Sequence, residues 1–224
     1  MTLFARPFVF FDLDGTLVDT RAAVLECYTR VYREHLNADF PPASIPAGEV
    51  FAMRPAELFA RVAPDRVAEL YEAYRVTYPS CIDKVSIFPR VAEMIGALVE
   101  SGRKPGLVTN KGLERTLIDL SVAGIPESAF CTIVTAEDTR ERKPDPAPIL
   151  LALERTGASP ADGVYVGDGP QDILAARAAG MPCVALTYGF YAREDLIPYA
   201  PDVLVDDARD LAAVLGADLP EAAR

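Results

Sequence analysis

Short apolar runs alternate with amphipathic patterns along most of this chain. The first run, Pro7 to Leu13, is apolar at nearly every position, which is typical of a strand buried on both faces of a parallel sheet. From Ile87 onward, patterns with apolar residues at every third or fourth position alternate with further short apolar runs. We predict strands at 106–109, 131–134, 164–166, 183–186 and 203–205, and helices at 91–99, 113–122, 147–155, 171–179 and 208–215. This alternation predicts an α/β fold with a doubly wound, mostly parallel sheet.

The segment from Thr20 to Ile87 does not share this alternation, because it shows helical patterns only. Its three helical stretches cover Thr20 to Leu36, a segment that opens at Arg54-Pro55, and Pro64 to Tyr78. We therefore predict two domains. An α/β core comprises residues 1–19 and 88–224, and an all-helical domain over residues 20–87 is inserted after the first strand.

Polar residues follow several of the predicted strands at their carboxyl ends. They are Asp12 and Asp14 after the first strand, Thr109, Asn110 and Lys111 after the second, Lys143 after a loop, and Asp168 and Asp172 after the 164–166 strand. Open α/β sheets bind ligands in the crevice at this edge. We expect these side chains to converge there.

This set of residue types suits phosphate chemistry with a metal ion. Clustered carboxylates repel one another unless a cation lies among them, and Mg²⁺ prefers oxygen ligands. A hydroxyl, backbone N–H groups and a lysine can hold a phosphoryl group. One carboxylate can act as the nucleophile, and a second can protonate the leaving oxygen and then activate water.

Composition narrows the function classes further. The 22 basic and 33 acidic residues give a net charge of −11, which disfavours nucleic acid or an anionic membrane as a partner. His35 is the one histidine and lies at the predicted end of an exposed helix, so histidine-based chemistry is not expected. The chain has no GxxxxGK[ST] segment, which argues against a P-loop nucleotide hydrolase.

The cysteines and the hydropathy pattern indicate a cytoplasmic protein. The cysteines are far apart and predict reduced, separately buried thiols rather than a zinc site or a disulfide framework: Cys27, Cys81, Cys131 and Cys183. No apolar run approaches the roughly 18 residues that cross a bilayer, and no signal peptide is expected.

The segment from Phe11 to Thr20, FDLDGTLVDT, resembles the first motif of the haloacid dehalogenase-like (HAD) phosphatases. Thr109, Lys143 and the Asp168/Asp172 pair resemble the second, third and fourth motifs. The resemblance covers almost the whole chain and implies a Rossmann-like core with a helical cap domain that closes over the active site.

The same resemblance implies a role for each matching residue. Asp12 would be the nucleophile and Asp14 the general acid/base. Mg²⁺ would be held by the Asp12 carboxylate, the Asp14 backbone carbonyl and Asp168. The remaining roles are implied as follows: Thr109, the Asn110 backbone N–H and Lys143 hold the phosphoryl oxygens, Lys111 belongs to the substrate-binding set, and Asp172 supports the metal site or orients Lys143.

Several short sequence segments resemble the corresponding segments of phosphoglycolate phosphatases. They are the segments 108–111 (VTNK) and 143–146 (KPDP) and parts of 172–189. Gly169 and Arg142 depart from the pattern common among relatives. Arg54, at a predicted helix start in the inserted domain, is a candidate partner for a substrate carboxylate, since a guanidinium binds this group bidentately.

The expected function is hydrolysis of a small phosphorylated metabolite, favouring phosphoglycolate, by a monomer or homodimer. The alternatives on the same scaffold are a pyrophosphatase, a nucleotidase and a sugar-phosphate phosphatase or phosphomutase. A receiver-type signalling module shares the Asp, Thr and Lys set, but it is about half this length and lacks the Asp-x-Asp pair. A dehalogenase would leave Asp14 and the phosphate-binding set without a purpose.

Overall fold

The computed structural model describes residues 6–42, 45, 50, 51, 53–217 and 219. The chain divides into two compact units. One comprises Met1–Asp19 and Ser86–Arg224, and the other comprises Thr20–Val85. Each unit is described by itself below.

The first unit is built on a parallel sheet. In the described part of the chain its strands are β1 (Phe8–Phe11), β4 (Lys104–Val108), β5 (Ile133–Val134), β6 (Gly163–Gly167), β7 (Cys183–Leu186) and β8 (Val203–Val205). They lie in the order β5-β4-β1-β6-β7-β8, and every pairing is parallel. The predicted α/β fold is therefore confirmed. Because β1 lies between β4 and β6, the residues that follow these strands meet at one edge of the sheet.

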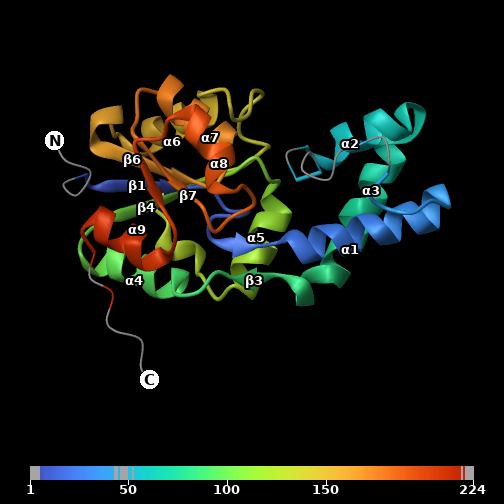
Figure 1. Ribbon diagram of the computed structural model, residues 1–224, viewed down its shortest axis with the longest axis horizontal. Coiled ribbons are helices and arrows are strands. Elements are labelled where there is room, and N and C mark those ends of the chain that lie inside the picture. The colour runs from blue at the N-terminus through green and yellow to red at the C-terminus, as the bar shows by residue number, and fades with distance from the viewer. Residues whose placement is uncertain (1–5, 43–44, 46–49, 52, 218, 220–224) are drawn as a thin grey trace. The chain divides into compact units, whose positions relative to one another are not determined.

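Helices cover both faces of this sheet, with α6 and α7 on one face and α4 and α9 on the other (Figure 1). The helices are α4 (Val91–Glu100), α5 (Leu113–Val122), α6 (Ala147–Thr156), α7 (Pro170–Ala178), α8 (Arg193–Leu196) and α9 (Ala208–Leu215), with 3₁₀ turns at Glu127–Ala129, Pro160–Asp162 and Ile197–Tyr199. Phe10 of β1 and Tyr165 of β6 are fully buried and pack with Ile149 of α6 and Ile173 of α7. Burial on both sides explains why β1 is apolar throughout.

A short antiparallel pair lies at the boundary of the first unit. Strand β2 (Val18–Asp19) pairs with β3 (Ser86–Ile87). The predicted insertion extends to residue 87, but the helical unit ends at Val85, because Ser86 and Ile87 belong to this pair. A strand of two residues is too short to show an alternation of apolar and polar residues. It is recognised only by its pairing with a segment that is distant in sequence.

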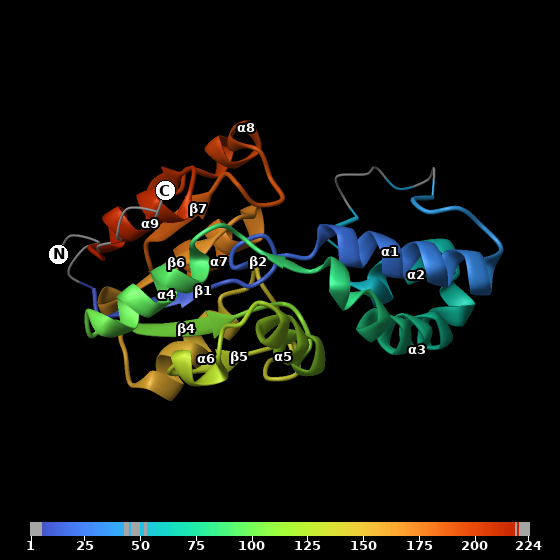
Figure 2. The ribbon, with the colours of Figure 1, turned by 90° about the horizontal axis from the view of Figure 1, so that it is seen from below.

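The second unit is helical (Figure 2). It contains α1 (Arg21–Val31), a π-helical stretch (Tyr32–Leu36), α2 (Pro55–Val62), α3 (Val67–Thr77) and 3₁₀ turns at Pro64–Arg66 and Tyr78–Lys84. Aromatic rings form its centre. The ring centroid of Tyr28 lies 4.8 Å from that of Tyr74 and 5.8 Å from that of Phe59. These distances are typical of favourable aromatic pairs.

The cysteines are free thiols, as expected, but they are not all buried. Cys27, Cys81 and Cys183 are buried, whereas Cys131 is exposed. The prediction is wrong at Cys131 because β5 begins only at Ile133, which leaves the cysteine outside the strand. Within the described residues, no helix has the length and apolar character needed to cross a membrane.

Candidate active site

Asp12 directly follows β1 and is held by a buried lysine from another segment. The Lys143 ammonium lies 2.8 Å from Asp12 Oδ1 and 2.7 Å from Asp172 Oδ1. It also donates to the hydroxyl of Tyr165 and to the carbonyl oxygen of Val108, at 2.7 Å and 3.0 Å. The Lys143 side chain is only 1% exposed, so nearly all its interactions are with the protein.

Burial and charge act in opposite directions on this group. Burial alone would lower the pKa of Lys143, but the carboxylates of Asp12 and Asp172 outweigh it and raise that pKa well above its usual range. Burial raises the pKa of Asp12 to about 7, although Lys143 pulls it down. The site thus holds a permanent ammonium beside a carboxyl group that is costly to ionise without a further cation.

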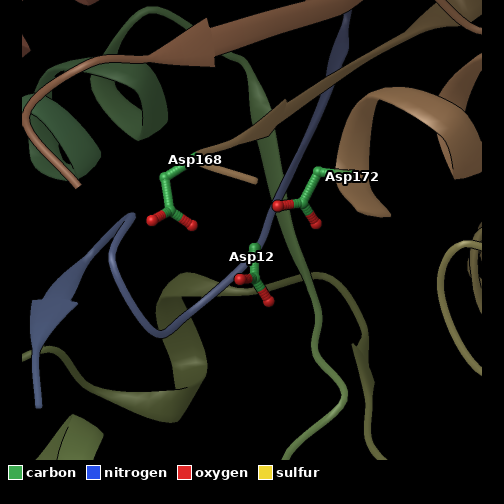
Figure 3. A group of neighbouring side chains, drawn as sticks. All are labelled: Asp12, Asp168 and Asp172. Atoms are coloured by element: carbon green, nitrogen blue, oxygen red, sulfur yellow. The ribbon is translucent and has the colours of Figure 1, made fainter. Parts of the chain in front are cut away.

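A cluster of buried carboxyl groups provides a place for such a cation. Asp12, Asp168 and Asp172 each contribute an oxygen within 4.8 Å of the others, and Figure 3 shows the three carboxyl groups together beyond the end of β1. Burial also raises the pKa of Asp168 well above its usual range, and the neighbouring Asp172 and Asp12 add to this effect. A divalent cation among these carboxylates would offset the cost of burying their charges and would reduce their mutual repulsion. Mg²⁺ prefers oxygen ligands. The donor set therefore fits Mg²⁺.

Two glycines make room for the Asp168 carboxylate. Gly15 has φ +81°, and a Cβ there would lie 2.1 Å from Asp168 Oδ2. At Gly189, a Cβ would lie 2.4 Å from the same oxygen. The backbone N–H of Phe190 donates to Asp168 Oδ2 at 2.6 Å. Two loops therefore pass directly against Asp168 and fix its carboxyl group.

Asp172 lies in the first turn of α7 and connects two parts of the site. Its Oδ2 accepts a hydrogen bond of 3.0 Å from the backbone N–H of Gly169, and its Oδ1 accepts from Lys143. A carboxylate in the first turn of a helix satisfies N–H groups that have no partner within the helix. Asp172 therefore contacts Lys143 and also belongs to the carboxylate cluster, and both roles expected for it, supporting the metal site and orienting Lys143, remain predictions.

The loop after β4 carries the predicted phosphate-binding residues. Thr109 is buried, and its Oγ1 accepts a hydrogen bond of 3.1 Å from the backbone N–H of Lys111. The side-chain amide of Asn110 donates to the carbonyl oxygen of Lys143 at 3.0 Å and accepts from the N–H of Lys143 at 3.1 Å. Asn110 thereby ties the loop after β4 to the backbone of Lys143.

Lys111 lies between two carboxylates. Its ammonium is 2.8 Å from Asp14 Oδ1 and also donates to Asp119 Oδ2, and its side chain is 4% exposed. Burial would lower the pKa of Lys111, but Asp14 and Asp119 raise it above its usual range. The predicted contact of Lys111 with substrate remains a prediction, while the contact with Asp14 is direct.

Sequence reasoning missed Asp119 and Tyr165. Asp119 lies three residues after the buried Thr116 and just before the buried Leu120, so helical spacing could have indicated a polar residue on the inner face of α5. Tyr165 is in the middle of a buried strand, where its hydroxyl needs a partner. Neither pattern in the sequence indicates which charged side chain each of these two residues contacts.

Arg54 is the N-cap residue of α2 in the helical unit. Its backbone N–H donates to Glu57 Oε2 at 3.2 Å, and its guanidinium lies 3.3 Å from Glu57 Oε1. Its side chain is 43% exposed. The expected contact of Arg54 with a substrate carboxylate remains a prediction.

A comparison with known families decides the classification. The model of the haloacid dehalogenase-like hydrolases matches residues 9–186, a range that includes Asp12, Lys143 and Asp168. The chain belongs to this family. The resemblance drawn from FDLDGTLVDT and the later motifs is confirmed, and so is the prediction of an enzyme.

The relatives compared below carry two kinds of name. A pyrophosphatase PpaX from Bacillus pumilus is 31% identical over 94% of this chain and 96% of its own length. A phosphoglycolate phosphatase from Salmonella paratyphi A is 41% identical, over 58% of this chain and 51% of its own. A solved structure described as a predicted phosphoglycolate phosphatase from Haemophilus somnus has a TM-score of 0.81 at 26% identity, covering 96% of this chain and 99% of the other.

Proposed function

We propose that the protein is a Mg²⁺-dependent phosphomonoesterase that forms an aspartyl-phosphate on Asp12. The observation that supports this proposal most directly is the buried Asp12 carboxyl group, which contacts Lys143 at the end of β1 and lies next to Asp168 and Asp172. Phosphoryl transfer depends mainly on positioning and charge neutralisation, and this arrangement supplies both.

In the first step, a carboxylate oxygen of Asp12 attacks the phosphorus of a phosphomonoester. A new bond joins this oxygen to phosphorus while the bond from phosphorus to the alcohol oxygen breaks. Asp14 donates its proton to the departing oxygen. In the second step, Asp14 accepts a proton from a water molecule whose oxygen attacks the phosphorus. The bond between phosphorus and the Asp12 oxygen breaks, which releases inorganic phosphate and restores the Asp12 carboxylate.

Lys143 and the loop after β4 serve the phosphoryl group in this proposal. The Lys143 ammonium neutralises charge on Asp12 and on the incoming phosphate. The Thr109 hydroxyl and the Asn110 backbone N–H bind phosphoryl oxygens. Asp12, Asp168 and the Asp14 backbone carbonyl would hold Mg²⁺, which when bound supplies positive charge at the phosphoryl group.

The proposed substrate is a small phosphorylated acid, with phosphoglycolate as the first compound to test. The KPDP and VTNK segments and the phosphoglycolate phosphatase relatives support it. Pyrophosphate is the second candidate, because the pyrophosphatase relative matches nearly the whole chain. In either case we propose that the helical unit serves as the cap.

A phosphate-release panel tests the class and the substrate together. It contains phosphoglycolate, pyrophosphate, nucleoside monophosphates and sugar phosphates, each with Mg²⁺ and with a chelator. Turnover should require Mg²⁺ and disappear in Asp12→Asn, since an amide cannot accept the phosphoryl group. Near-normal turnover by Asp12→Asn would contradict the mechanism, and the preferred compound decides between the two substrate candidates.

Arg54→Ala tests recognition of the substrate carboxylate. A charge-assisted hydrogen bond should be worth about 10-fold to 150-fold in kcat/KM for phosphoglycolate. An aryl phosphate, which has no carboxylate, should be hydrolysed nearly as before. Arg61→Ala, at the other end of α2, removes the same charge and should leave both substrates unchanged. Equal losses on both substrates in Arg54→Ala would assign the arginine to the stability of α2 instead.

A further inference from the structure

We propose that Asp119 is a positioning residue for the acid/base carboxyl group of Asp14 and acts through Lys111. This inference rests on the proposed function, in which Asp14 protonates the leaving oxygen. It concerns a carboxylate on α5 that lies outside the four motifs and outside the cluster of Asp12, Asp168 and Asp172.

The contacts form a chain from the interior to the reacting carboxyl group. Asp119 is 0% exposed and accepts from the Lys111 ammonium. The same ammonium lies 2.8 Å from Asp14 Oδ1. The Asp14 side chain is 26% exposed, so its carboxyl group reaches solvent while one of its oxygens is held from inside the protein.

Both ends of Lys111 are fixed. Its backbone N–H donates to Thr109 Oγ1 in the loop after β4, and its ammonium bridges the two carboxylates. These contacts hold the Lys111 side chain in one position between Asp119 and Asp14. Without the Asp119 carboxylate the buried ammonium would lose its interior partner, and the two remaining charges, Lys111 and Asp14, would be free to take a different geometry.

A change in the position of Asp14 has a specific kinetic signature. The parameter kcat/KM includes the steps up to departure of the alcohol, where Asp14 supplies its proton. A 4-nitrophenolate group departs without protonation, whereas a phenolate group needs it. Misplacement of Asp14 should therefore reduce kcat/KM for phenyl phosphate much more than for 4-nitrophenyl phosphate. A merely structural role would reduce both equally.

Asp119→Asn is the first test, because it removes the charge with little change in shape. We expect kcat/KM for phenyl phosphate to fall about 10-fold to 100-fold, as expected for a shifted catalytic group, and for 4-nitrophenyl phosphate to fall less than about 3-fold. Asp119→Glu, which restores the charge, should recover part of the loss. Glu114→Gln removes one charge from the exposed face of α5 and should leave both values unchanged.

A double-mutant cycle with Asp14→Asn shows whether the two carboxylates act through the same step. Once Asp14 cannot transfer a proton, the added Asp119→Asn change should cost nothing further on phenyl phosphate. Additive losses would contradict the proposal.

A second variant keeps the test decisive if Asp119→Asn does not fold stably. Lys111→Met/Asp119→Leu removes both buried charges and retains their volume, which buried ion pairs often tolerate. This variant should unfold cooperatively and still show the selective loss on phenyl phosphate. Wild-type kinetics in this variant would overturn the proposal.

The outcomes separate this proposal from the proposed function. If Asp14→Asn itself shows no selective loss on phenyl phosphate, the acid/base role in the proposed function is wrong. If Asp14→Asn shows that loss but Asp119→Asn reduces both substrates equally, the proposed function stands and only the positioning role is rejected.

Discussion

Gly15 meets two requirements that no other residue type satisfies together. Its φ of +81° lies in the left-handed region, and a Cβ would collide with the Asp168 carboxylate at 2.1 Å. The first requirement concerns the backbone alone, and the second concerns the candidate metal site. A comparison with a second glycine separates them.

Gly102 provides the matched control. Its φ is +79°, but a Cβ there would meet nothing within 4 Å. Both Gly15→Ala and Gly102→Ala should lose about 1–2 kcal/mol of stability from backbone strain, measured by urea unfolding. Only Gly15→Ala should displace Asp168, and we expect its Mg²⁺ affinity to fall about 10-fold to 100-fold in a calorimetric titration. Equal Mg²⁺ affinities in the two variants would show that Asp168 is not a ligand.

At the scale of elements, the helical unit depends on an aromatic centre. Phe59 of α2 is fully buried and packs edge-on to Tyr28 of α1 and to Tyr74 of α3, at centroid distances of 5.8 Å and 6.4 Å. Its ring therefore joins three helices that are each too short to be stable alone. The helices form as a packed unit rather than from their propensities.

Phe59→Ala should destabilise the helical unit by about 3–5 kcal/mol, because it leaves a cavity among the rings. The measurement is chemical unfolding followed by tyrosine fluorescence. Mg²⁺ affinity should stay at the wild-type value, because the candidate ligands all belong to the other unit. Tyr71→Ala on α3 is the control, since this ring is 37% exposed and should cost far less. Loss of Mg²⁺ binding in Phe59→Ala would mean that the two units do not fold independently.

The helices and strands with clear patterns are predictable because one local property defines them. The helices Leu113–Val122 and Ala208–Leu215 and the strand Cys183–Leu186 have their predicted bounds. The pair β2–β3 and the π-helical stretch at Tyr32–Leu36 are not predictable in this way. The strand pair depends on contacts between residues that are distant in sequence, and the π-helical stretch depends on a small change in the hydrogen-bonding pattern. Neither produces a periodic pattern of apolar residues in the sequence.

At the scale of the whole molecule, the buried acidic cluster couples stability to pH and to Mg²⁺. Without a metal ion, burial raises the pKa of Asp12 from its usual 3.8 to about 7. As the pH rises between these values, the unfolded chain loses the proton first, so the folded state binds more protons. Stability from this group therefore falls with rising pH. Asp168 shifts in the same direction.

We expect the thermal unfolding midpoint, measured with a chelator present, to decrease as the pH is raised from about 4 to about 7, and to decrease less in Asp12→Asn, whose amide does not titrate. Mg²⁺ should stabilise the protein more at the higher pH, because its ligands must be deprotonated. At 100 times the Kd the gain is about 2.7 kcal/mol, or roughly 5–10 °C for a chain of this size. Differential scanning calorimetry measures both effects. If the unfolding midpoint of Asp12→Asn depended on pH as strongly as that of the wild type, Asp12 would not be the group responsible for the pH dependence.

The sequence by itself determined the α/β class, the inserted helical segment and the residues at the strand ends. It could do so because these features follow from local periodicity and from motifs with fixed spacing, such as the Asp12-x-Asp14 pair. The tertiary structure decided which charges meet. Lys143 bridges Asp12 and Asp172, and Lys111 is held by Asp14 and Asp119, eight residues further along the chain on α5. Such pairings depend on how parallel strands and their loops are placed side by side, and a buried ammonium is stable only beside the particular carboxylates that this packing brings to it.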